Sequence, residues 1–176
     1  MKSNIVLIGF MGTGKTAVGQ VLSKRLNRQL IEVDEVIEKI AGKTIPDIFH
    51  DNGEIHFREL EIEAIRQAVK GEKQVIACGG GAVLNTINID RLRSNGVIIN
   101  LVAGPEIILQ RTSGESGSRP LLNTAQPLER IKELQKFRKP FYDRAADITI
   151  NTSKLSIDIT ADKIIDRLKK YEGFNF

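Results

Sequence analysis

Residues 9–16 read GFMGTGKT, which matches the phosphate-binding P-loop pattern G-x-x-x-x-G-K-[ST]. An unbroken apolar run at residues 5–8 precedes it, as is typical of a parallel strand buried on both faces. From Lys15 onward apolar residues recur at helical spacing, so the pattern predicts a strand, a glycine-rich turn and an amphipathic helix. The backbone N–H groups and the dipole at the start of such a helix attract phosphate. A glycine-rich turn followed by a chance Lys-Thr would lack this strand and helix context.

The residue types within the motif suit a nucleoside triphosphate. Gly12 and Gly14 allow backbone angles and a close approach that a side chain would block. Lys15 can reach the β- and γ-phosphates, and the Thr16 hydroxyl can ligate Mg²⁺. The sequence therefore predicts a nucleoside triphosphate site that works with Mg²⁺.

Composition limits the other classes of function. The 176 residues suggest one domain, and their net charge is +4 with only 5% aromatic residues. Because the basic residues are spread along the chain, we expect no nucleic-acid partner, and no stretch has transmembrane length. Cys78 is the single cysteine, which excludes an internal disulfide and favours a reducing compartment, here the cytoplasm. Neither histidine stands in a cluster that would bind zinc.

The rest of the chain alternates between apolar runs and helical patterns. This alternation predicts a parallel sheet covered by helices on both faces, an α/β fold. The expected strands after the first are residues 29–33, ending at Asp34, and then 74–78, 97–102 and 148–150. A turn is expected at Asn95-Gly96, and a helix over 127–145 places Leu128, Ile131, Leu134 and Phe137 on one face, with Pro140 as a kink site.

Two segments are longer than such a fold requires. Residues 34 to about 70 have a helical pattern broken at Gly53, and they could form a small lobe for a second substrate. Residues 112–125 have the Gly/Ser-rich composition of a mobile loop.

Unusual residues follow two of the expected strands, at the sheet edge where ligands bind in such folds. Asp34 can orient a substrate hydroxyl for attack, and it can equally serve as the N-cap of the following helix. Gly79-Gly80-Gly81 indicates close approach of the backbone to a ligand, the alternative being a tight turn.

Three arginines, Arg58, Arg119 and Arg138, lack obvious i,i+4 partners in the sequence. Taken alone, each is more typical of a solvated or salt-bridged surface residue.

Together these segments resemble shikimate kinase along essentially the whole chain. The matching segments are GFMGTGKT (9–16), VDEVIE (33–38), FRELE (57–61), ACGGGAV (77–83), SRPLL (118–122) and FRKPFY (137–142). The resemblance implies a nucleoside-monophosphate-kinase-like fold with a five-stranded parallel sheet of order 2-3-1-4-5. It also implies transfer of the γ-phosphoryl group of ATP to the 3-hydroxyl of shikimate, a step in aromatic amino-acid biosynthesis.

The resemblance further implies a role for each matching position. The ATP phosphates would be held by Gly12, Thr13, Gly14, Lys15, Thr16 and Ala17, with Thr16 on Mg²⁺. Asp34 would bind the shikimate hydroxyls, and Arg58 and Arg138 the carboxylate, beside the Gly79–Gly81 backbone. Arg119 would belong to a lid over ATP at 112–125, and Arg111 would stack near the adenine. Lys15, Asp34 and Arg119 are thus the predicted catalytic residues of a single domain, residues 1–176, that acts as a monomer, with a substrate-binding insertion at 34–61.

One position departs from the family pattern. The family often has Asp-x-Asp after the second strand, whereas this chain has Glu32-Val33-Asp34, and its third strand carries no acid. We expect Glu32 to reach Mg²⁺ through water.

Two rival interpretations remain at this level. One is another small-metabolite kinase of the gluconate type, which need not pair Arg58 with Arg138. The other is a non-catalytic nucleotide-binding module, against which the intact Lys15, Thr16 and Asp34 argue.

Overall fold

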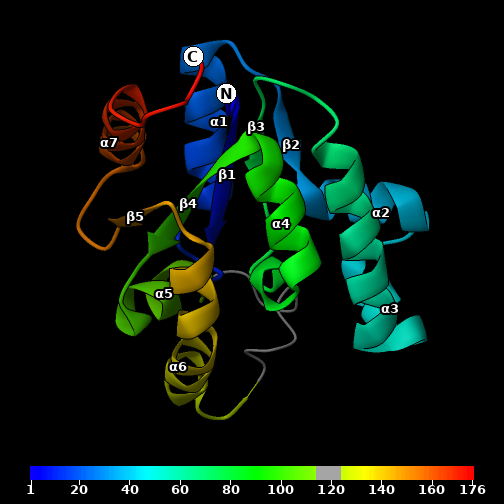
Figure 1. The fold of residues 1–176 in the computed structure, drawn as a ribbon. Coiled ribbons are helices and arrows are strands. Elements are labelled where there is room, and N and C mark those ends of the chain that lie inside the picture. Colours follow the sequence, from blue (N-terminus) through cyan, green and yellow to red (C-terminus); the bar gives the residue numbers. More distant parts are fainter. Residues whose placement is uncertain (114–123) are drawn as a thin grey trace.

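The computed structural model describes residues 1–113 and 124–176. The strands of this part form an all-parallel sheet in the order β2-β3-β1-β4-β5 (Figure 1), which confirms the predicted fold class. The strands are β1 (Asn4–Gly9), β2 (Leu30–Glu32), β3 (Val75–Ala77), β4 (Gly96–Val102) and β5 (Ile148–Asn151). The strand that leads into the P-loop therefore lies at the centre of the sheet.

Helices connect the strands and cover the sheet. They are α1 (Lys15–Leu26), α2 (Val33–Ala41), α3 (Ile45–Ala68), α4 (Thr86–Asn95), α5 (Pro105–Thr112), α6 (Pro127–Ala145) and α7 (Ile157–Lys169), with a short 3-10 turn η1 (Ala82–Leu84). None of the described helices is both long enough and apolar enough to span a bilayer.

The two faces of the sheet bury separate cores. Along β1, Ile5 and Leu7 pack with the apolar residues of α1 and α7. Val6 and Ile8 face the other way, into a cluster that takes residues from α2 to α6. Because successive side chains of a strand point to opposite faces, a continuous apolar run is what a sheet covered on both faces requires.

Individual residues of the sequence mark the ends of α2 and α3, as predicted. Gly42 ends α2 in the left-handed conformation, and the Thr44 side chain caps α3 by accepting a hydrogen bond from the Asp47 N–H. Within α3, Gly53 has φ 79° and ψ 177°, so the helix is broken there into two parts.

Several expected boundaries were wrong. The second strand ends at Glu32, and α2 begins at Val33, so Asp34 lies in the first turn of a helix rather than at a strand end. The N-cap of α2 is Glu32, and therefore the cap interpretation of Asp34 is also wrong. At Asn95-Gly96 there is no separate turn, because α4 ends at Asn95 and β4 begins at Gly96.

The expected apolar face of α6 was wrong at one residue. Phe137 is 62% exposed, whereas Arg138 is only 5% exposed and lies on the buried stripe with Ile131 and Tyr142. Arg138 and Tyr142 follow Ile131 by seven and eleven residues, a spacing that keeps all three on one face of a helix. A charged residue is not expected on a buried helix face. The helix continues through Pro140.

Candidate active site

The P-loop connects β1 to α1 in a conformation that depends on its glycines. Gly12 and Gly14 have φ of 74° and 98°, values that a residue with a side chain rarely adopts. A Cβ on Gly12 would also lie 2.9 Å from the Thr112 side chain at the end of α5. The Lys15 ammonium donates hydrogen bonds to the carbonyls of Gly9 (2.9 Å) and Phe10 (3.0 Å), so it lies across the mouth of the loop.

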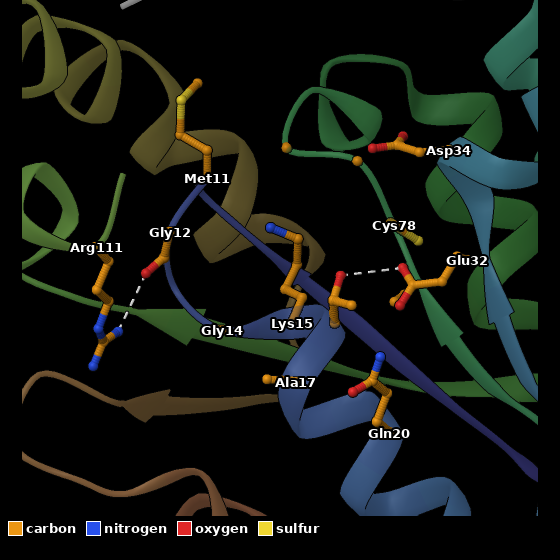
Figure 2. Close-up of a pocket in the computed structure, with 14 residues that line it drawn as sticks. Met11, Gly12, Gly14, Lys15, Ala17, Gln20, Glu32, Asp34, Cys78 and Arg111 are labelled. Atoms are coloured by element: carbon orange, nitrogen blue, oxygen red, sulfur yellow. Dashed lines mark hydrogen bonds between the residues drawn. The ribbon is translucent and has the colours of Figure 1, made fainter. Parts of the chain in front are cut away.

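The P-loop forms one wall of a cleft of about 510 Å³ (Figure 2). Figure 2 shows Glu32 and Asp34 on the side of this cleft opposite Gly12 and Arg111. The predicted site residues that line it are Gly12, Gly14, Lys15, Thr16, Ala17, Glu32, Asp34, Gly79, Gly80 and Arg111. Residues from the P-loop, β2, α2, α5 and the segment after β3 therefore meet in one cleft, as expected for the carboxyl ends of parallel strands.

Thr16 and Glu32 lie together on the floor of the cleft. The Thr16 hydroxyl donates to Glu32 Oε2 at 3.3 Å. Burial raises the pKa of the Glu32 carboxyl, while the Thr16 hydrogen bond acts in the opposite direction. The second carboxylate oxygen, Oε1, is buried and has no hydrogen-bond partner among the described residues. A hydroxyl beside an incompletely paired carboxylate is a donor set that fits hydrated Mg²⁺.

The two outer glycines of the run after β3 leave room for neighbouring side chains, and the middle one lies in ordinary contact with a third. A Cβ on Gly79 would lie 2.9 Å from Asp34 Oδ1, and one on Gly81 would lie 2.4 Å from both terminal nitrogens of Arg58. A Cβ on Gly80 would lie 3.6 Å from a terminal nitrogen of Arg138. Asp34, Arg58 and Arg138 therefore gather around one turn, whereas the close approach to a ligand that the glycines indicate stays a prediction.

The two arginines differ in their surroundings. Arg58 donates to Glu61 (2.9 Å) and Glu54 (3.2 Å), so the expectation that it lacks simple partners along its helix was wrong. Arg138 lies over the Phe10 ring at 5.7 Å, and its Nε has no hydrogen-bond partner in the described part of the chain. A buried Arg138 with an Nε unpartnered among the described residues, next to Arg58 at the same turn, favours an anionic group beside these two guanidinium groups.

Comparison with known proteins identifies this arrangement. The model of the shikimate kinase family matches residues 11–169. The chain belongs to the shikimate kinase family. The shikimate kinase of Thermoanaerobacter pseudethanolicus is 49% identical over 170 residues, covering 95% of this chain and 98% of that one. That of Caldanaerobacter subterraneus is 47% identical, with 97% and 98% covered.

Solved structures of shikimate kinases share the fold. The shikimate kinase from Acinetobacter baumannii, in complex with shikimate, superposes with a TM-score of 0.92 at 35% identity, covering 98% of this chain and 96% of that one. The shikimate kinase from Aquifex aeolicus gives a TM-score of 0.82 at 36% identity, with 94% and 96% covered. These likenesses favour the shikimate kinase interpretation over the gluconate-type kinase and the non-catalytic module.

Sequence reasoning missed two residues of this shikimate kinase site. Glu61 is 1% exposed and pairs with Arg58; burial raises the pKa of its carboxyl, and Arg58 partly offsets that effect. Tyr142 donates its hydroxyl to the Gly80 carbonyl, and burial raises its pKa to about 12, so it stays a donor at neutral pH. The Arg58-x-x-Glu61 spacing could have indicated the first, whereas no local signal marks the second.

One predicted site residue cannot be placed. Arg119 and the SRPLL segment lie outside the described residues, as does most of the expected lid at 112–125.

Proposed function

We propose that this chain transfers the γ-phosphoryl group of ATP to the 3-hydroxyl of shikimate, giving shikimate 3-phosphate and ADP. The observation that carries this proposal is the turn at Gly79–Gly81. Gly80 and Gly81 adjoin Arg138 and Arg58, which suit a carboxylate, while Gly79 and Gly80 line the cleft that also contains the P-loop. An acidic acceptor bound at this turn would therefore lie next to the cleft that holds the phosphate donor.

On this proposal the P-loop positions the donor. The backbone N–H groups of residues 12–17 and the start of α1 hold the phosphates. Lys15 would exchange its carbonyl partners for phosphate oxygens and stabilise charge on the group being transferred. The Thr16 hydroxyl would hold Mg²⁺, with Glu32 bonded through water, and the ion supplies charge neutralisation on the phosphates.

Asp34 orients the acceptor. Its carboxylate lies against Gly79 on the cleft wall, where it can accept a hydrogen bond from the attacking hydroxyl. A strong base is unnecessary, because in a loose phosphoryl-transfer transition state the nucleophile needs little deprotonation and its position matters most. Arg58 and Arg138 grip the shikimate carboxylate and thereby fix which hydroxyl faces the phosphate.

The remaining assignments rest on the family resemblance. Arg111 stacks near the adenine, and Arg119 contacts the phosphates from a lid over 112–125. Residues 34–61 form the substrate-binding part of a single domain that acts as a monomer on small molecules alone.

A coupled ADP-release assay with purified protein, ATP and Mg²⁺ tests the function. We expect ADP release that depends on shikimate and is absent with gluconate at the same concentration. A release that is equal with and without shikimate, or that gluconate supports, would contradict the proposal.

A further inference from the structure

Two residues, Thr152 and Arg111, donate hydrogen bonds to carbonyls of the P-loop, and we call this pair the clasp. Thr152 follows β5 directly, is 3% exposed, and is fixed to β4 because its N–H donates to the Val102 carbonyl at 2.8 Å. Its hydroxyl donates to the Thr13 carbonyl at 3.1 Å and also lies 3.3 Å from the Val102 carbonyl. A residue at the end of the last strand is thereby bonded to the loop that follows the first.

Arg111, in the last turn of α5, completes the clasp. One terminal nitrogen donates both to the Gly12 carbonyl (3.2 Å) and to the Thr152 hydroxyl (3.1 Å). The other donates to the Thr152 carbonyl at 2.9 Å. A hydroxyl has one hydrogen to give and two lone pairs to accept with, so it can receive from Arg111 and donate to Thr13 at once.

The direction of these bonds matters for phosphate binding. In a P-loop the N–H groups must face the ligand, so consecutive carbonyls turn away from it and need donors behind the loop. Thr152 and Arg111 supply donors to two consecutive carbonyls, those of Gly12 and Thr13. Gly12 in turn packs so closely on Thr112 that the loop is confined between α5 and the end of β5.

We propose that Thr152 is a positioning residue for nucleotide binding: with Arg111 it fixes the two peptide groups that contain the Gly12 and Thr13 carbonyls, so that the N–H groups in them, those of Thr13 and Gly14, face the phosphates. The terminal nitrogens of Arg111 make these hydrogen bonds, so the flat face of its guanidinium group would remain available to stack on the adenine. This inference rests on the proposed function, because it assumes that the P-loop binds ATP.

The experiment compares ADP binding by isothermal titration calorimetry in wild type and Thr152→Val, which removes the hydroxyl and keeps the shape. We expect ADP to bind roughly tenfold or more weakly, because small misplacements of a positioned site are costly. Thr152→Ser, which keeps the hydroxyl, restores ADP affinity. Thr149→Val, on the exposed part of β5, is the matched control and leaves ADP affinity unchanged.

Further measurements separate positioning from general stability. Shikimate affinity and the melting temperature of Thr152→Val should stay close to wild type, whereas a merely structural role would lower both together with ADP affinity. Arg111→Lys should also weaken ADP binding, because lysine lacks the planar fork of arginine. The loss of ADP affinity in the double variant should be clearly smaller than the product of the two single losses and close to the larger of them.

ADP affinity equal to wild type in Thr152→Val, or fully additive effects in the double variant, would overturn the clasp. Failure of the proposed function would look different. Wild type would bind ADP and Thr152→Val would bind it more weakly, as expected, yet wild type would release no ADP in the assay with ATP and shikimate.

Discussion

Substituting Gly81 by alanine should impair shikimate binding through Arg58 alone. Gly81 has φ −96°, which alanine adopts without strain, so the effect of Gly81→Ala is purely steric. The new Cβ would lie 2.4 Å from both terminal nitrogens of Arg58, against ordinary contacts that begin near 3.4 Å. The guanidinium must therefore retreat by about 1 Å. Since it is the free end of a flexible side chain, the fold should tolerate this movement.

The size of the effect follows from what that retreat breaks. A shift of about 1 Å lengthens an ordinary hydrogen bond beyond hydrogen-bond distance. It would therefore separate the guanidinium from a bound carboxylate. A hydrogen bond to a charged group contributes about 1.5–3 kcal/mol. The dissociation constant for shikimate should accordingly rise roughly 10- to 100-fold.

Calorimetric titration of shikimate and, separately, of ADP measures this prediction. Only the shikimate constant should change in Gly81→Ala. Gly104→Ala is the matched control, because Gly104 has φ −63° and a Cβ there would meet nothing closer than 3.7 Å. Shikimate affinity within twofold of wild type in Gly81→Ala would refute the placement of the carboxylate beside Arg58.

Substitutions at three other positions probe the remaining parts of the site. Lys15→Met should lose turnover by roughly a hundredfold or more, because methionine cannot stabilise charge on the transferring group; near-normal turnover would mean that the P-loop assignment is wrong. Arg138→Ala should weaken shikimate binding by about 2–5 kcal/mol with little change for ATP, and equal losses for both ligands in calorimetry would count against its role. Glu32→Ala should raise the Mg²⁺ concentration for half-maximal rate roughly 10- to 100-fold while Glu32→Asp is nearly silent; superimposable Mg²⁺ curves for wild type and Glu32→Ala would remove Glu32 from the site.

The parts of this protein that were predictable from sequence are those whose signal is contiguous. The P-loop pattern, the apolar run before it and the helical pattern after it together identify the central strand and the anion site. Gly42, Thr44 and Gly53 mark helix ends and a break because each acts on its own backbone. The order of the strands came from the family resemblance, since hydrophobic patterns alone do not say which strands are neighbours.

The errors arise where tertiary contacts override local pattern. Asp34 lies in a helix because β2 has only three residues and Val33 turns into the core beside Ile37. Arg138 is buried in place of Phe137 because the buried face of α6 meets the Phe10 ring and the Gly80 backbone. Thr152 is an ordinary residue in the sequence, and its role depends on the Thr13 carbonyl, which is 139 positions away.

The three glycines show how a sequence pattern can mark a site without saying what the pattern does there. Their sequence indicates close approach of the backbone to something, and the structure shows that the nearest groups are side chains of the site itself. Gly79 makes room for Asp34, which would orient the acceptor, and Gly81 makes room for Arg58, which would hold its far end. Tyr142 fixes the turn between them by bonding the Gly80 carbonyl. The distance between the groups that bind the two ends of the acceptor is therefore set by one short, rigid turn. A larger residue at either outer glycine should move one of these groups relative to the other, and this is why Gly81→Ala should affect the acceptor and spare the nucleotide.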